Sequence, residues 1–141
     1  MLGVLFAALV ALTVYANARR GDFVYDDMKQ IVGNELIQDA RYTARALTSD
    51  VWAFRGDKGS SWSNYWRPVF ILWLMANYRL FGLGSTLGWH IANALLHAAV
   101  VLLAFRWLRL MGSEPAIALG IVLIFAVHPA HVESVAWMAG R

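Results

Sequence analysis

Three long stretches without a formal charge constrain this chain more than any other feature. Residues 1–18, 80–105 and 115–132 contain no Asp, Glu, Lys or Arg. A helix needs about 20 mostly apolar residues to cross the hydrocarbon core of a bilayer. Only 15% of all residues are charged, whereas a soluble domain usually carries about 25%. The sequence therefore predicts an all-α integral membrane protein with about three transmembrane helices.

Composition also excludes several classes of protein. The chain has no cysteine, so it has neither a disulfide framework nor a thiolate metal site. Its net charge of +3 is scattered rather than gathered in a basic stripe, so nothing indicates a nucleic-acid partner. The first apolar run could be a signal peptide cleaved after Ala16-Asn17-Ala18. No basic residue precedes that run, which favours a retained span.

Polar residues divide the chain into segments. All but six of its 12 basic and 9 acidic residues lie between Arg19 and Arg67, which indicates a loop outside the membrane. We expect a first transmembrane helix (1–18), an external polar loop with juxtamembrane helices (19–67), an interfacial helix (68–81), second and third transmembrane helices (86–110 and 115–127), and an external motif (128–141).

The arginines after the second span indicate the orientation of the chain. Arg106 and Arg109 follow that span, and an excess of Lys and Arg marks the cytoplasmic side. The loop 19–67 and the motif 128–141 are therefore expected on the same outer face. Arg19 and Arg20 argue weakly against this orientation, but the acidic residues of the loop lower its net charge.

Asp26 and Asp27 are the first candidates for chemistry. Two adjacent carboxylates could ligate a divalent cation, or one could act as a general base; we favour Asp26 as the reactive one. An alternative is purely structural. Asp27 and Gln30 have the spacing of a capping box, in which Asp27 accepts from the helix backbone and Gln30 reaches back.

A second group of polar residues lies on the second span. His90, Asn93 and His97 are spaced so that they share one face of a helix. Ionisable residues inside a membrane are costly and usually face a cavity or a partner. The alternative is that they form hydrogen bonds between helices and only hold the bundle together. His90, near the outer interface, is the better functional candidate.

Arg67 stands between Trp66 and Pro68 at the start of the interfacial helix. Proline is well tolerated in the first turn of a helix. An arginine fixed there can hold a phosphate through two hydrogen bonds. The alternative is an arginine whose head reaches the lipid headgroups.

The last motif reads HPAHVESVAWMAGR, from His128 to Arg141. Pro129 can end one helix and start another, which places His128 at a helix N-terminus. Glu133, Trp137 and Arg141 recur every four residues and are expected on one side of the new helix. The spacing differs from His-Glu-x-x-His, which argues against a zinc peptidase. The alternative is an interfacial helix with a Trp anchor. We expect this motif, Arg67 and the Asp pair to meet at one interface.

Read in order, these motifs resemble a known family. They are Phe-Val-Tyr-Asp-Asp with Ile31–Asn34, the aromatic-Arg-Pro at 66–68, Asn77–Gly82, Trp89–His97 and Phe125–Arg141. The series resembles the N-terminal part of the transmembrane and tetratricopeptide-repeat (TMTC) glycosyltransferases, a bacterial relative being expected. The resemblance covers nearly the whole chain, and its last motif is the most specific.

The resemblance implies a multi-pass glycosyltransferase of the GT-C architecture. Such enzymes take a sugar from a polyprenyl-phosphate donor on the outer or lumenal side of a membrane, here the bacterial inner membrane or the endoplasmic reticulum. Animal members transfer mannose to protein Ser/Thr hydroxyls. The resemblance implies that Asp26-Asp27 is either the catalytic base or a metal site. In the second case a divalent cation would be the cofactor. The implied donor-phosphate or substrate-binding residues are Arg67, His90, His128, His131, Glu133 and Arg141.

The family continues through further spans and usually into helical repeats. The chain is therefore expected to be a fragment that is inactive alone, and its expected partners are a lipid-linked sugar, membrane lipid and a protein acceptor. Two other functions stay open: a non-catalytic membrane scaffold or assembly subunit, and a proton-coupled transporter in which His90, His97 and Glu133 carry protons.

Overall fold

A computed structural model describes residues 2–58 and 65–140. Within these ranges every regular element is helical, which confirms the all-α prediction. The α-helices are α1 (Leu2–Val14), α2 (Glu35–Gln38), α3 (Thr43–Thr48), α4 (Pro68–Phe81), α5 (Thr86–Leu110), α6 (Pro115–Val127) and α7 (Val132–Ala136). Short 3-10 turns cover Ala16–Arg20, Ala40–Tyr42, Ala53–Lys58 and Pro129–His131, and a π-helical turn covers Met28–Val32.

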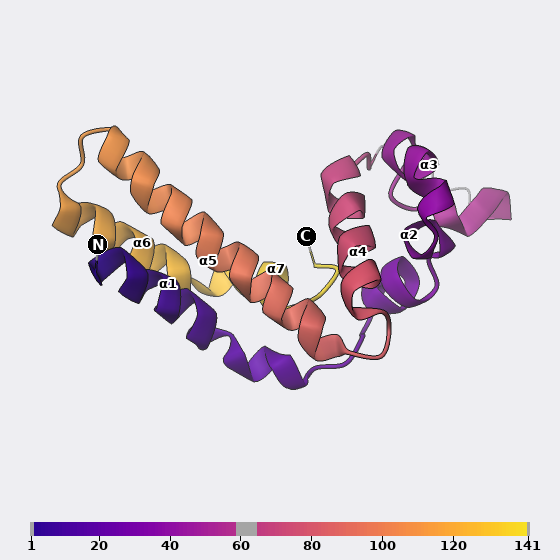
Figure 1. Cartoon of the computed structure of the whole chain (residues 1–141), viewed down its shortest axis with the longest axis horizontal. Coiled ribbons are helices and arrows are strands. Elements are labelled where there is room, and N and C mark those ends of the chain that lie inside the picture. Colours follow the sequence, from indigo (N-terminus) through magenta and orange to yellow (C-terminus); the bar gives the residue numbers. More distant parts are fainter. Residues whose placement is uncertain (1, 59–64, 141) are drawn as a thin grey trace.

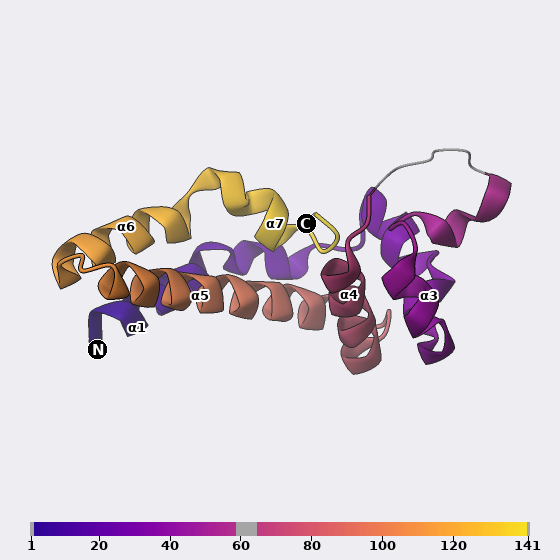
Figure 2. The same cartoon turned by 90° about the horizontal axis from the view of Figure 1, so that it is seen from above.

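Three long helices form one elongated half of the molecule. Helices α1, α5 and α6 run side by side (Figures 1 and 2). Their contact surface consists mainly of small side chains, namely Ala7, Ala11, Ala98, Val101, Val122 and Ala126. Small residues let helix backbones approach closely, as is common for helices packed in lipid. Large apolar side chains face outward instead, and Leu9, Leu103 and Ile124 are each more than half exposed.

Only part of the expected three-span topology is reproduced in the described residues. With 25 residues, α5 is about 37 Å long, and within residues 2–58 and 65–140 it is the one helix long and apolar enough to cross a membrane. Helix α6 and the segment Pro129–Ala136 give a second span if their 51° bend is counted as a break within one span. Helix α1 has 13 residues, about 20 Å, because the chain leaves α-helical geometry at Tyr15.

The second half of the molecule is a small module built from the polar loop and α4. The π-helical turn, α2 and α3 pack against α4 around an apolar core (Figure 1). This core contains Ile31, Ile37, Ala46, Val51, Ile71, Leu74 and Met75, together with Trp89 from α5 and Met138 and Ala139 near the C-terminus. The C-terminal segment therefore ties the module to the bundle.

A sharp corner joins α4 to α5. Gly82 ends α4 with φ 59° and ψ −155°, a conformation that is essentially restricted to glycine. The indole Nε1 of Trp89 donates to the Gly82 carbonyl at 3.0 Å. At Gly88 a Cβ would stand 2.3 Å from the Phe81 ring, so glycine is needed for this close approach. The corner turns α4 steeply away from α5 (Figure 2).

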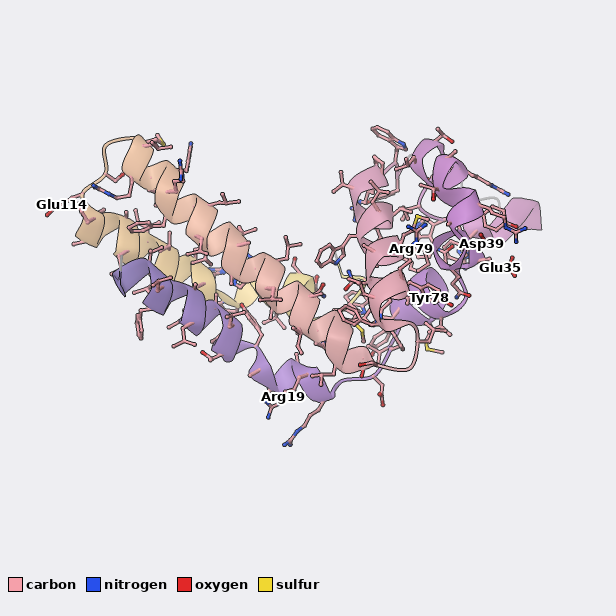
Figure 3. The ribbon with its side chains drawn as sticks, viewed as in Figure 1. Arg19, Glu35, Asp39, Tyr78, Arg79 and Glu114 are labelled. Carbon is pink, nitrogen blue, oxygen red and sulfur yellow. The ribbon has the colours of Figure 1, made fainter. Side chains whose placement is uncertain are left out.

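Charged residues lie at the ends of the bundle and in the module. Figure 3 shows Glu114 at the turn between α5 and α6, Arg19 at the opposite end of α1, and Glu35, Asp39 and Arg79 in the module. Figure 2 shows that the module and the C-terminal segment share the end of the bundle where α5 begins. Arg106 and Arg109 belong to the other end of α5.

Candidate functional site

Asp26 and Arg67 line the same pocket although 40 residues separate them. The pocket has a volume of about 430 Å³, and we call it the Asp26 pocket. Its lining residues are Asp26, Gln30, Val51, Trp52, Tyr65, Arg67, Phe70, Trp137, Ala139 and Gly140. Asp26 is partly buried, and it supplies the carboxylate of this lining, while Arg67 supplies the guanidinium.

The segment before α4 is fastened to the end of α3, and this fixes Arg67. The Tyr65 carbonyl accepts from the Val51 N–H at 2.9 Å, and the Tyr65 N–H donates to the Asp50 carboxylate at 3.0 Å. The Trp66 indole donates to the Leu47 carbonyl at 2.8 Å. The Arg67 guanidinium lies 4.8 Å from the centre of the Tyr65 ring, a cation–π contact. Arg67 therefore enters the pocket from an anchored backbone.

Asp27 has a different role from its neighbour. It is fully buried, and its carboxylate accepts from the Val24 N–H at 3.1 Å and from the Ala139 N–H at 2.7 Å. The capping-box alternative for Asp27 and Gln30 is wrong, because Asp27 makes no side-chain cap. The carboxylate is used instead to hold the C-terminal segment.

The same contacts overturn the helix expected over the last motif. Helix α7 ends at Ala136, and Trp137 is extended. The Trp137 carbonyl accepts from Asn93 Nδ2 at 3.3 Å, and Asp27 binds the backbone two residues later. These bonds pull the chain out of helical geometry, so Glu133 and Trp137 do not share a helix face. Arg141 lies outside the described residues.

Several of the predicted site residues line a second pocket rather than the Asp26 pocket. This second pocket has a volume of about 640 Å³ and is lined by Asp27, His90 and Glu133 among others. We call it the His90 pocket. Trp137 lines both pockets and stands between them. The predicted polar residues are divided between these two pockets: Asp26 and Arg67 line one together with Trp137 of the last motif, while His90 and Glu133 line the other.

The polar residues of α5 bind neighbouring segments. His90 Nε2 lies 3.1 Å from the Gly21 carbonyl, and His97 Nε2 lies 3.1 Å from the Ala126 carbonyl. Asn93 accepts from the Trp73 indole at 3.2 Å and donates to Trp137. All three are buried. These contacts agree with the structural alternative, in which the face formed by these residues holds the helices together.

His128 and His131 are not among the lining residues of either pocket. His128 is exposed, and its Nδ1 accepts from the Ala130 N–H at 3.2 Å, so it caps the 3-10 turn Pro129–His131 as expected for a helix N-terminus. The His131 ring packs against Phe125 with ring centres 4.3 Å apart and against His97 at 5.3 Å.

The donor set does not fit a divalent cation. Among residues 2–58 and 65–140, no three His, Asp or Glu side chains are grouped so that they could hold a metal. Each oxygen of the Asp27 carboxylate already accepts one backbone N–H, and Asp26 and Asp27 line different pockets. We therefore derive no step through a metal at Asp26-Asp27.

Sequence reasoning missed several residues of the Asp26 pocket. Trp52 and Tyr65 carry no motif signal, because their positions depend on how the loop folds back onto α4. Gln30 was assigned only to a capping box. Its signal was the four-residue spacing from Asp26, which places two side chains on the same side of a helical turn.

Burial of Asp27 predicts a specific pH dependence. Burial raises the pKa of its carboxyl above the ordinary value, against hydrogen bonds that lower it. The folded state therefore binds the proton of the Asp27 carboxyl more tightly than the unfolded state does. The contribution of this proton to the stability of the fold is complete below about pH 4. The contribution is lost as pH rises through the raised pKa. We expect the melting temperature of Asp27→Asn, measured in detergent, to vary less with pH over this window than that of the wild type. Identical pH profiles would contradict a raised pKa.

Comparison with known proteins shows which class of protein this chain is similar to. Over nearly its whole length the chain is similar to animal proteins named protein O-mannosyl-transferases. It is 36% identical over 140 residues to Tmtc1 of Drosophila melanogaster, 33% over 138 residues to Tmtc2 of the same species, and 34% over 145 residues to TMTC4 of Homo sapiens. These relatives confirm the resemblance to the TMTC proteins.

The alignments cover 99%, 97% and 94% of this chain but only 16%, 14% and 19% of the respective relatives. The chain therefore spans less than a fifth of the length of these curated relatives. No protein-family model matches the chain, and no solved structure matches it.

Proposed function

We propose that this chain is the part of a TMTC-type membrane glycosyltransferase that contains the catalytic carboxylate. In this proposal the enzyme transfers a sugar from a polyprenyl-phosphate donor to a protein Ser/Thr hydroxyl. Two findings support it. Asp26 and Arg67 line one pocket, and the similar proteins are named protein O-mannosyl-transferases. The shared pocket carries the proposal, because it combines a base for the acceptor with a cation for a leaving phosphate.

The proposed reaction is one displacement. Asp26 takes the proton of the acceptor hydroxyl. The hydroxyl oxygen attacks the anomeric carbon while the bond from that carbon to the phosphate oxygen breaks. The polyprenyl phosphate leaves with the bonding electrons, and Arg67 stabilises its developing charge. The anomeric centre is inverted.

The proposed membrane arrangement places this pocket on the outer or lumenal face. Helix α5 spans the bilayer, α6 with Pro129–Ala136 forms a broken second span, and α1 inserts beside them as the third. The apolar side chains that these helices expose, such as Leu9, Leu103 and Ile124, would then contact lipid. The turned-away helix α4 would lie along the interface.

The His90 pocket is less suited to the donor phosphate. Its lining contains two exposed acidic residues, Asp22 and Glu133, whose charges would repel a phosphate. The Asp26 pocket is lined by the guanidinium of Arg67 instead. The proton-transporter alternative is also less favoured, because His90 and His97 bind backbone carbonyls.

The direct test is transfer of labelled mannose from polyprenyl-phosphate mannose to a Ser/Thr-rich peptide. The complete gene product in native membranes would be compared with membranes that lack it. Transfer that depends on the gene product supports the proposal. If these membranes transfer no sugar from polyprenyl-phosphate mannose, glucose or galactose, the proposal is wrong and the scaffold alternative is favoured.

Arg67→Gln is expected to lower kcat/KM for the donor by about tenfold to a hundredfold, because a charge-assisted contact with the phosphate is lost. Arg67→Lys should recover part of this loss, since it keeps the charge but not the planar fork. Steady-state kinetics at varied donor concentration measure both. A control is Arg41→Gln, which removes an exposed arginine paired with Asp39 and should leave kcat/KM unchanged. Equal activity of Arg67→Gln and wild type would show that Arg67 does not bind the donor.

A further inference from the structure

Gln30 has an unusual position in the wall of the Asp26 pocket. Its side chain is only 6% exposed, and its Oε1 has no hydrogen-bond partner. It lies on the π-helical turn Met28–Val32, a rare geometry that is frequent at functional sites. Most buried polar atoms in proteins are paired, and one that is not calls for a specific explanation.

The other lining residues indicate what would pair with this oxygen. Four of them are aromatic, namely Trp52, Tyr65, Phe70 and Trp137. A volume of about 430 Å³ lies within the range of small-molecule sites, where apolar walls combine with a few polar groups that fix orientation. A sugar ring has both features that this wall needs, because its C–H faces pack on aromatic rings and its hydroxyls donate hydrogen bonds.

We infer that Gln30 is a specificity-determining residue that accepts a hydrogen bond from one ring hydroxyl of a hexose bound in the Asp26 pocket. The identification of this hexose with the transferred sugar rests on the proposed function. Binding of the hexose itself does not, so the two can fail separately. A site built to pair with a hydroxyl rejects the analogue that lacks it, because the buried oxygen is again left unpaired.

The test is binding of methyl mannopyranoside and its four monodeoxy analogues to the full chain in detergent. Calorimetry reports binding. The wild type should bind one analogue about tenfold more weakly than the parent sugar, as expected for a single lost hydrogen bond. Gln30→Met should bind the parent and that analogue equally. Gln30→Glu keeps an oxygen at this place and should retain the discrimination.

Asn77→Leu is the matched control. Asn77 is also buried with an unpartnered side-chain oxygen, but it is not among the residues that line the Asp26 pocket. This variant should keep the tenfold discrimination even if its melting temperature falls, which separates sugar recognition from a general loss of stability.

Three outcomes would overturn the inference. Gln30→Met could still discriminate tenfold, the wild type could bind no methyl hexoside, or the wild type could bind all five equally. Selective binding together with an absence of sugar transfer would reject the enzyme while keeping Gln30 as a hexose-binding residue.

Discussion

Asp26→Asn is expected to lower sugar transfer by the complete gene product at least about a hundredfold, the scale of a lost general base. Asp26 is the carboxylate of the pocket that Arg67 also lines. It makes no hydrogen bond or ion pair with the other described residues, whereas Asp27 accepts from the backbone N–H groups of Val24 and Ala139. The substitution keeps the size of the side chain, so the melting temperature should stay within about 1 °C of the wild type.

Labelled-mannose transfer, with protein level and melting temperature measured in the same membranes, would check this. Asp22→Asn is the control, because Asp22 is an exposed acid that lies four residues before Asp26 and lines only the other of the two pockets. It should transfer at the wild-type rate. If Asp26→Asn also transfers at that rate, Asp26 is not the base. A loss in Asp26→Asn accompanied by unfolding would instead show a structural role.

The helical character of the chain was predictable from its apolar runs, since few other structures bury so many consecutive apolar residues. The start of α4 followed from Pro68, which has no N–H to lose in a first turn. The lengths of α1 and α7 were not predictable in this way. Tyr15 and Trp137 leave α-helical geometry where no proline or glycine marks a break.

For the candidate site, too, the residues marked by a local sequence motif were predictable, whereas the contacts between distant segments were not. Asp26 was recognisable as one of two adjacent carboxylates and Arg67 as the arginine between Trp66 and Pro68, and both line one pocket. The separation of His90 and Glu133 from them could not be foreseen. It depends on Asp27 and Asn93 binding the backbone near Trp137, and a pair 112 residues apart leaves no periodic signal in the sequence.

Asp27→Ala is expected to lower the free energy of unfolding by about 2–4 kcal/mol. The substitution leaves the N–H groups of Val24 and Ala139 without their acceptor, the first in a partly buried bond and the second in a buried one, and each such loss costs about 1–3 kcal/mol. Chemical denaturation of the full chain in detergent measures the change. Asp27→Asn keeps one acceptor oxygen and should lose roughly half as much. Asp22→Ala, which removes an exposed carboxylate, should change the free energy by no more than about 0.5 kcal/mol.

The effect of Asp27→Ala should be largest near the C-terminus, because Asp27 joins the start of the loop to a segment that also contributes to the Asp26 pocket. Hydrogen exchange of the Ala139 amide should accelerate more than that of amides in the middle of α5. Sugar transfer should fall together with this protection, since Trp137, Ala139 and Gly140 line the pocket. Unchanged exchange at Ala139 would contradict the anchoring role. Retained transfer despite fast exchange would show that the reaction does not need this wall of the pocket.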